Sequence, residues 1–310
     1  MAARTFTIGT RGSRLATRQT EMALAALTGA RPDSVFELRT ISTSGDRSQQ
    51  SLAEIGGRGV FVIEIERALL DGEIDLAVHS LKDLPSAETD GLTIAAVLPR
   101  DDPRDALVSR DGSALAALPS GATVGTGSPR RAAQLTALRP DIEVRDIRGN
   151  VDTRIRKTEE GEYDAVVLAA AGLARLGWLG RASQVFEPEE MLPAVGQGAL
   201  AVQVRSDDRD ALDLVRAVED RDTRVAVTAE RGLERRLGGG CHAAIAAYAG
   251  VGYGSSPERA PLRLRGLVGG EGRLLRGEME SPAGEADALG VRLAEYLIAQ
   301  GADVLLEAAE

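Results

Sequence analysis

Cysteine is nearly absent from this chain of 310 residues, in which Cys241 stands alone. A single cysteine excludes a disulfide within the chain and is typical of a reducing compartment. Aromatic residues make up only 3% of the sequence, so its cores must be built from alanine, valine, leucine and isoleucine. No stretch approaches the roughly 20 consecutive apolar residues of a membrane span, and residues 1–6 lack the apolar run of a signal peptide. We therefore expect a cytoplasmic protein that does not enter a membrane.

Lysine is also scarce, because only Lys82 and Lys157 occur among 37 basic residues and the others are arginines. The net charge of −10 argues against nucleic acid as a partner. Genomic composition accounts for much of the arginine excess, but arginine also binds carboxylates through two parallel hydrogen bonds. His79 and His242 are the only histidines, and together with Cys241 they are too sparse to predict a metal site.

Strands and helices alternate along most of the chain, and two segments repeat the same order. Residues 9–13 and 125–128 share a Gly-Thr turn that ends in serine, and residues 72–78 and 161–167 share a Gly-Glu-x-Asp strand. The repetition predicts two copies of one α/β unit. We expect helices at 15–27, 60–70, from 129, 151–160, 226–237 and 286–299, and strands at 6–9, 36–41, 73–78, 123–125, 162–168, 199–205, 261–267 and 273–279.

The predicted domains follow from these elements. A hinge near residues 99–103 leads from the first copy to the second, and the strand at 199–205 is expected to return to the first sheet. We therefore predict an N-terminal α/β domain at 1–98 with 199–216, a second α/β domain at 99–198, and a C-terminal α+β domain at 217–310. The polar stretch at 42–58 is long for a connection, which is typical of a lid or a disordered loop.

The two copies differ where the repeated strand ends. The first copy continues into His79, Ser80, Lys82 and Asp83, whereas the second continues into alanines. Ligands of α/β sheets bind at the carboxyl ends of strands. Asp83 is thus the strongest acid–base candidate, and the alternative is a structural ion pair with Lys82.

Two arginines stand where a helix should disfavour them. Ser128 suits an N-cap and Pro129 the first helical position, so Arg130 and Arg131 fall in the first turn, beside the positive end of the helix dipole. A bound anion would offset this charge, and the alternative is two solvated surface arginines. Further arginines at loop or strand ends favour a site for a polycarboxylate: Arg11, Arg148, Arg154 and Arg205.

Cys241 follows three glycines, which allow the backbone to turn sharply and a bulky group to approach. The simplest interpretation of a lone cysteine is a small apolar core residue. A reactive thiol and a catalytic pair with His242 are the alternatives.

Seven stretches in order carry a resemblance: Gly9-Thr10-Arg11-x-Ser13, Gly56-Gly57-Arg58-Gly59-Val60-Phe61, His79-Ser80-Leu81-Lys82-Asp83-Leu84-Pro85, Gly125-Thr126-x-Ser128-x-Arg130-Arg131, Arg148-Gly149-Asn150-Val151, Gly196-Gln197-Gly198-Ala199 and Gly239-Gly240-Cys241. Together they closely resemble the hydroxymethylbilane synthase family, also called the porphobilinogen deaminase family. The resemblance implies two periplasmic-binding-protein-like α/β domains around a cleft and a small α+β C-terminal domain. It also implies a transferase of haem biosynthesis that condenses four porphobilinogen molecules head to tail, with release of ammonia, into the linear tetrapyrrole hydroxymethylbilane.

The resemblance also implies the site. Cys241 would carry a covalent dipyrromethane cofactor through a thioether, which replaces the Cys–His alternative, and Asp83 would be the catalytic carboxylate that stabilises a cationic azafulvene. The implied cofactor-binding residues are Cys241, Lys82, Ser80, Thr126, Ser128, Arg130, Arg131, Arg148 and Gly149. The implied substrate-binding residues are Arg11, Ser13, Arg154, Arg175, Gln197 and Arg205. No metal is implied, and a monomer is expected.

Two departures and one rival interpretation accompany this resemblance. Glu54 and Arg58 stand where several family members have lysine, so the loop residues receive no role. The rival is a non-catalytic anion receptor, because the same duplicated fold serves solute binding and effector sensing, and fold alone does not separate the two. The rival predicts reversible binding without a covalent adduct.

Overall fold

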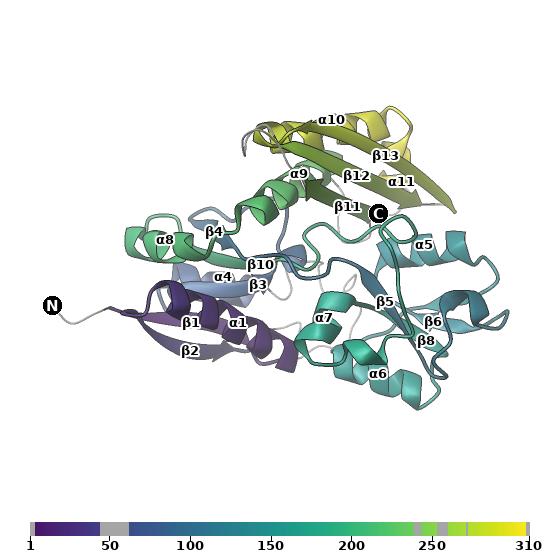
Figure 1. The fold of residues 1–310 in the computed structure, drawn as a ribbon, viewed down its shortest axis with the longest axis horizontal. Helices are drawn as coiled ribbons and strands as arrows, with labels where there is room; N and C mark the ends of the chain where they lie inside the picture. The colour runs from purple at the N-terminus through teal and green to yellow at the C-terminus, as the bar shows by residue number, and fades with distance from the viewer. Residues whose placement is uncertain (1–3, 44–61, 239–242, 253–259, 271, 308–310) are drawn as a thin grey trace. The chain divides into compact units, whose positions relative to one another are not determined.

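The computed structural model describes residues 4–43, 62–238, 243–252, 260–270 and 272–307, and the chain divides into two compact units (Figure 1). Unit 1 comprises Met1–Asp101 and Ala199–Arg224, and unit 2 comprises Asp102–Gly198 and Val225–Glu310. Within the described ranges, no helix is both long enough and apolar enough to cross a bilayer. The predicted loop at 42–58 and the Gly239–His242 segment lie wholly or largely outside the described residues.

Unit 1 is built on a five-stranded sheet in the order β2-β1-β3-β10-β4. Strand β1 runs parallel to β2 and β3, and β10 runs antiparallel to β3 and β4. The return of the chain to this sheet at residue 200 confirms the prediction for that strand. The strands are β1 (Thr5–Arg11), β2 (Val35–Ile41), β3 (Leu76–Ser80), β4 (Leu92–Val97) and β10 (Leu200–Arg205).

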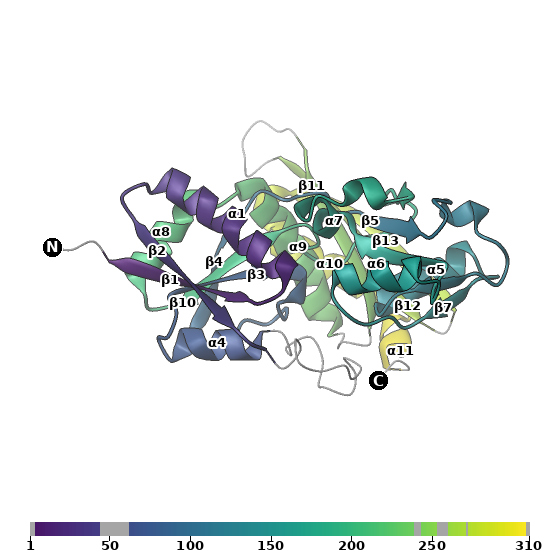
Figure 2. The same cartoon turned by 90° about the horizontal axis from the view of Figure 1, so that it is seen from below.

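Helices cover both faces of this sheet (Figure 2). Helices α1 (Arg14–Ala30) and α8 (Arg209–Val215) pack on one face, where Ile8, Leu76 and Val202 are buried. Helix α4 (Ile63–Leu70) packs on the other face. Because side chains alternate along a strand, successive residues of β3 face α1 and α4 in turn.

The first sheet of unit 2 repeats this arrangement in the order β7-β6-β8-β5-β9. Its central strand β6 is parallel to β7 and β8, and β5 is antiparallel to β8. The elements are β5 (Asp105–Ser109), β6 (Thr123–Gly125), β7 (Glu143–Arg145), β8 (Ala165–Ala169), β9 (Gln184–Val185), α5 (Pro129–Leu138), α6 (Val151–Glu159) and α7 (Ala170–Arg175). Helix α5 packs on one face, and α6 and α7 pack on the other.

The predicted duplication is confirmed at the level of single hydrogen bonds. The Thr7 amide donates to Asp75 Oδ2 at 2.8 Å, and the Thr123 amide donates to Asp164 Oδ2 at 2.8 Å. Before each aspartate, a glycine with positive φ follows the helix, at 70° for Gly72 and 84° for Gly161. Positive φ is readily adopted only by glycine, which is why the two segments have the same pattern.

The rest of unit 2 is an antiparallel sheet covered by helices. Its order is β11-β12-β13, formed by β11 (Ala244–Val251), β12 (Pro261–Gly270) and β13 (Arg273–Pro282), with α10 (Ala286–Ile298) and α11 (Ala302–Glu307). Helix α9 (Arg221–Leu237) begins in unit 1 and belongs to unit 2 from Val225 onward. A Cβ on Gly290 would lie 2.2 Å from the Ala229 carbonyl oxygen, so α9 and α10 approach closely only because this residue is glycine. Short 3₁₀ turns complete the chain: η2 (Leu81–Asp83), η3 (Leu115–Ala117), η4 (Leu179–Arg181), η5 (Arg216–Val218) and η6 (Ala283–Glu285).

The predicted mixed α/β class with a small C-terminal α+β part is therefore confirmed. The sequence-based prediction lacks strands β4, β5, β7, β9 and β11 and helices α7, α8 and α11, and α9 begins at Arg221 rather than at residue 226. The assignment of 217–310 to a domain of its own stays a prediction.

Candidate functional site

One edge of the unit 1 sheet gathers five of the predicted site residues. Strands β1 and β3 are parallel neighbours, so their carboxyl ends lie at the same edge. Arg11 and Ser13 follow β1, and Ser80, Lys82 and Asp83 follow β3. All five side chains are half-buried, which leaves each of them partly accessible to a ligand.

Local hydrogen bonds hold this edge in place. The Ser13 hydroxyl accepts from the Ala16 amide at 3.2 Å and caps α1, and the Leu81 amide donates to the Ala199 carbonyl at 3.0 Å. Gln19 donates from Nε2 to Ser80 Oγ at 2.8 Å and is only 6% exposed. Sequence analysis missed Gln19, because a glutamine within a helix carries no signal of its own.

The Asp83 carboxylate has no hydrogen bond or ion pair to any described residue. The alternative of a structural pair between Lys82 and Asp83 is therefore not what the structure shows. A half-buried carboxylate that has lost part of its hydration and has no partner among the described residues is available to a cationic or N–H-donating ligand.

The corresponding edge of unit 2 gathers a second set of predicted residues. Thr126 and Ser128 follow β6, and the Thr126 hydroxyl accepts from the Ser128 amide at 3.2 Å. Arg148 follows β7 and bonds to Asp146 at 2.9 Å, and Arg154 donates to the Gly149 carbonyl at 2.7 Å. Gly149 has a φ of 110°, so this turn requires glycine. Thr126 is buried at 4% exposed, and the remaining hydroxyl and guanidinium groups at this edge are of the kinds that suit an anionic ligand.

Arg130 and Arg131 are buried rather than solvated, at 4% and 6% exposed. Both bind Asp105, which is fully buried: Arg130 Nη1 lies 2.6 Å from Oδ2, and Arg131 Nη2 lies 2.7 Å from Oδ1. The anion predicted near the first turn of α5 is therefore, at least in part, the Asp105 carboxylate of the chain itself. One carboxylate serves two guanidinium groups, so the cluster keeps a net positive charge.

The Asp105 carboxylate also accepts a hydrogen bond from Gln197. Gln197 Nε2 donates to Asp105 Oδ1 at 3.0 Å and to the Pro103 carbonyl at 2.6 Å. Burial alone would raise the pKa of Asp105, but Arg130 and Arg131 hold this pKa well below its usual range. Gln197 is itself fully buried. Gln197, which was predicted to bind substrate, is therefore part of the buried cluster around Asp105.

The Asp105→Asn variant is expected to lose about 3–5 kcal/mol of unfolding free energy at pH 7, because two buried guanidinium groups lose their counter-charge. Urea unfolding checks this value. Since the folded-state pKa of Asp105 is depressed, its contribution is present above the unfolded-state pKa of about 3.9 and is lost as the pH falls below it.

The difference between wild type and Asp105→Asn should therefore be constant from neutral pH to about pH 5 and shrink below about pH 4. Asp141→Asn is the matched control, because the Asp141 carboxylate pairs with Arg139 at the surface, where such pairs contribute little. Equal losses in the two variants would contradict the role assigned to Asp105.

Two further predicted residues, Arg175 and Arg205, donate hydrogen bonds to backbone carbonyl groups. Arg175 donates from Nη2 to the Gly198 carbonyl at 2.6 Å. Arg205 ends β10, which runs antiparallel to β3, so it lies beside the start of β3 rather than near Ser80. There it donates to the carbonyls of Leu69 and Ile74, each at 2.8 Å. We therefore leave Arg205 out of the proposed site.

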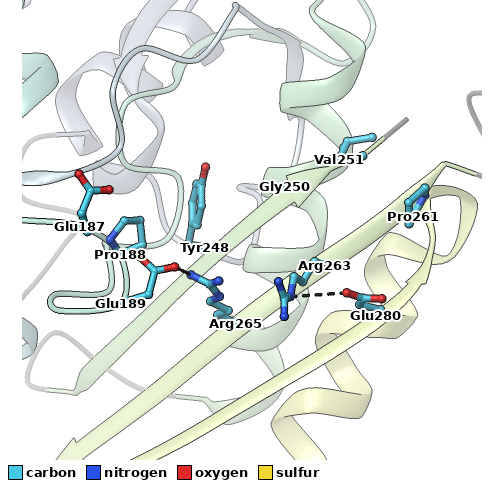
Figure 3. Close-up of a pocket in the computed structure, with 11 residues that line it drawn as sticks. Glu187, Pro188, Glu189, Tyr248, Gly250, Val251, Pro261, Arg263, Arg265 and Glu280 are labelled. Carbon is cyan, nitrogen blue, oxygen red and sulfur yellow. Dashed lines mark hydrogen bonds and ion pairs between the residues drawn. The ribbon is translucent and has the colours of Figure 1, made fainter. Parts of the chain in front are cut away.

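A pocket of about 490 Å³ lies elsewhere in unit 2, over β11 and β12 (Figure 3). Its charged side chains are all in ion pairs: Arg265 pairs with Glu189, Arg263 pairs with Glu280 at 3.5 Å, and Glu187 pairs with Arg104 outside the pocket. None of the predicted site residues lines it. Because each of its charged side chains already has an ion-pair partner, we assign no ligand to this pocket.

Comparison with known proteins gives full-length matches. A family model described as "Porphobilinogen deaminase, dipyromethane cofactor binding domain" matches residues 6–213, and one described as "Porphobilinogen deaminase, C-terminal domain" matches residues 224–299. A porphobilinogen deaminase of Roseiflexus sp. (strain RS-1) is 50% identical over 304 residues, which cover 97% of this chain and 98% of that protein. A porphobilinogen deaminase of Brevibacillus brevis is 48% identical over 302 residues, with 97% and 96% covered.

Among solved structures, a periplasmic binding protein of Salmonella typhimurium with high arginine specificity matches at 14% identity and a TM-score of 0.41. The match covers 72% of this chain and 94% of that protein.

Proposed function

Because the chain belongs to the porphobilinogen deaminase family, and is thus an enzyme with a dipyrromethane cofactor, we propose that it condenses four porphobilinogen molecules head to tail. Each condensation releases one ammonia, and addition of water releases the linear product hydroxymethylbilane. The observation that carries the proposal is the half-buried Asp83 carboxylate, which has no partner among the described residues and shares a sheet edge with Arg11 and Lys82.

Asp83 is the proposed catalytic residue. Loss of ammonia leaves positive charge on the aminomethyl carbon and pyrrole ring of the substrate, and a fixed carboxylate stabilises that charge more strongly than it stabilises neutral substrate. Arg11, with Ser13, is proposed to bind an acetate or propionate of the incoming porphobilinogen. Arg154 and Arg175 are proposed to bind the carboxylates that accumulate as the product grows.

The cofactor fits the residues available in each unit. Cys241, which lies outside the described residues, is the proposed attachment point, because it is the only thiol. Thr126, Ser128, Arg148 and Gly149 in unit 2, and Ser80 and Lys82 in unit 1, are proposed to bind its carboxylates. Arg130 and Arg131 add the net positive charge of their cluster with Asp105 in unit 2. When bound, the cofactor supplies the pyrrole carbon to which the first substrate is joined.

We further propose that the chain acts as a cytoplasmic monomer with three domains, at 1–98 with 199–216, at 99–198 and at 217–310. The acidic net charge of −10 supports the absence of a nucleic-acid partner.

The test is turnover of porphobilinogen with parallel measurement of ammonia and of tetrapyrrole formed after acid oxidation of the product. We expect four ammonia per tetrapyrrole. The anion-receptor alternative predicts that porphobilinogen binds and is recovered unchanged, with no ammonia released. That result, obtained with protein purified from cells able to make porphobilinogen, would reject the proposed reaction.

A further inference from the structure

The turn between β7 and α6 in unit 2 carries an ion pair at the edge where several proposed cofactor residues gather. Arg148 donates from Nε to Asp146 Oδ2 at 2.9 Å. The side chain of Arg148 is 27% exposed, and that of Asp146 is 53% exposed. Neither Nη1 nor Nη2 of Arg148 makes a hydrogen bond to any described residue. Asp146 therefore occupies one side of the guanidinium group and leaves its two terminal nitrogens to a ligand.

A second arginine of the same segment has a more fully occupied guanidinium group. Arg145 donates from Nε to Glu143 Oε1 at 2.8 Å and from Nη2 to Glu143 Oε2 at 2.9 Å. Glu143 thus takes the whole side of that group, in the paired arrangement that carboxylates prefer, whereas Asp146 binds Nε–H alone. Both pairs join residues two positions apart. The pair on β7 is therefore the matched control for the pair in the turn.

Three features fix the position of Asp146. The Tyr163 hydroxyl donates to the Asp146 carbonyl at 2.7 Å, and the next residue, Ile147, is buried at 1% exposed. A Cβ on Gly127 would lie 2.8 Å from Asp146 Oδ1 and 3.8 Å from the central guanidinium carbon of Arg148. The guanidinium group therefore lies over the turn before α5, and only glycine leaves room there for the carboxylate.

The first copy of the α/β unit forms the same turn without the ion pair. The register of β1 with β2 matches that of β6 with β7 when the two Gly-Thr turns are aligned. In that register Thr40 takes the place of Asp146, and two residues later Ser42 takes the place of Arg148. The contact to the turn is equivalent, because a Cβ on Gly12 would lie 3.5 Å from Thr40 Cγ2. The fold does not require the charged pair, so stability alone does not account for it.

We propose that Asp146 is a positioning residue that holds the Arg148 guanidinium to bind a cofactor carboxylate through both Nη groups, an inference that rests on the proposed function. Occupation of Nε–H excludes side-on binding and leaves the end-on mode, in which Nη1 and Nη2 each donate one hydrogen bond. The anchor also removes freedom that a long side chain would otherwise lose when the ligand binds. Because the Asp146 carboxylate is exposed, water and salt screen its repulsion of the ligand.

The experiment measures how much the attached cofactor raises the unfolding temperature. The cofactor gain is the unfolding temperature of a protein whose adduct is verified by intact mass, minus that of the same protein with Cys241→Ser. In Asp146→Ala the cofactor gain should fall by about 2–4 °C, because Arg148 loses its anchor in both backgrounds but contacts the cofactor in only one. Asp146→Asn keeps an oxygen that accepts from Nε and should retain the wild-type cofactor gain.

Glu143→Ala is the matched control, because it removes the partner of Arg145 from the same segment. Any change in its unfolding temperature should be equal with and without the adduct. Its cofactor gain should therefore equal the wild-type value.

Gly127→Ala tests the same position from the other side of the carboxylate, because its Cβ would displace Asp146 Oδ1. This variant should lower the cofactor gain as Asp146→Ala does. The double variant should lose no more than either single variant, since both act through the guanidinium group of Arg148. Additive losses would overturn the part assigned to Gly127.

Four results would overturn the inference as a whole. They are an unchanged cofactor gain in Asp146→Ala, a larger gain in that variant, equal losses in Asp146→Ala and Asp146→Asn, and equal losses in Asp146→Ala and Glu143→Ala. A larger gain would mean that Asp146 competes with the cofactor for Arg148. Failure of the proposed function is distinguishable, because the wild type would then carry no adduct and release no ammonia from porphobilinogen. Failure of this inference alone would leave both properties of the wild type intact.

Discussion

The Asp83→Asn variant is expected to release ammonia from porphobilinogen about 10²–10³ times more slowly than wild type, with its fold and its cofactor adduct retained. Asparagine has nearly the same shape as aspartate, but it carries no charge to stabilise the cation that forms as ammonia leaves. Because Asp83 binds no described residue, the substitution breaks no side-chain bond within the part of the chain that the structure describes. The effect should therefore appear in kcat, measured under saturating porphobilinogen.

The matched control is Asp90→Asn, which removes one exposed carboxylate from the same unit and should leave kcat unchanged. Thermal unfolding of both variants separates loss of chemistry from loss of structure. An Asp83→Asn enzyme with the wild-type kcat would contradict the assignment of Asp83 as the catalytic carboxylate.

The Cys241→Ser variant is expected to carry no adduct and to form no hydroxymethylbilane, because a serine hydroxyl is a far weaker nucleophile than a thiolate. Intact mass of the denatured protein should show two linked pyrrole units on the wild type and the bare polypeptide for the variant. The sequence offers a second measurement, because Cys241 is its only thiol. A thiol reagent should find no free thiol in the denatured wild type if the cofactor is attached there.

The intact mass and the free-thiol measurement together test whether the cofactor is attached to Cys241. A wild-type protein with the adduct mass and one free thiol would place the cofactor on another side chain and contradict the Cys241 assignment. A bare mass with one free thiol, unchanged after incubation with porphobilinogen, would favour the anion-receptor alternative.

Local sequence determined most of the secondary structure and the duplication. Ser128 acts as an N-cap, as its position before the helix predicts, and Ser13 in the matching turn of the first copy does the same. Strand β11 escaped prediction because five of its eight residues are alanine or glycine, which have weak strand preferences. Its extended form comes from the ladder with β12 that spans its whole length, and a ladder exists only once the sheet has formed.

For the candidate site too, some features could be predicted from the sequence and others could not. Residues that follow parallel strands could be grouped from the sequence, because the carboxyl ends of neighbouring parallel strands share one edge. The same reasoning grouped Arg205 with them, although β10 is antiparallel to β3 and its carboxyl end lies at the opposite edge. Strand direction within a sheet is a property of the tertiary structure, so the sequence alone could not separate Arg205 from the site.

Side-chain partners distant in sequence were likewise decided only by the tertiary structure. In the sequence, Asp105 is one of several acidic residues in a charged segment. In the structure it is fully buried and pairs with Arg130 and Arg131. Glu66 and Gln203 are 137 residues apart and meet because β10 returns to the first sheet above α4. The sequence by itself determined which chemical groups stand at the ends of its strands. Only the packing of strands and helices decided which groups are exposed to a ligand and which neutralise one another, because charge pairing and burial depend on neighbours in space.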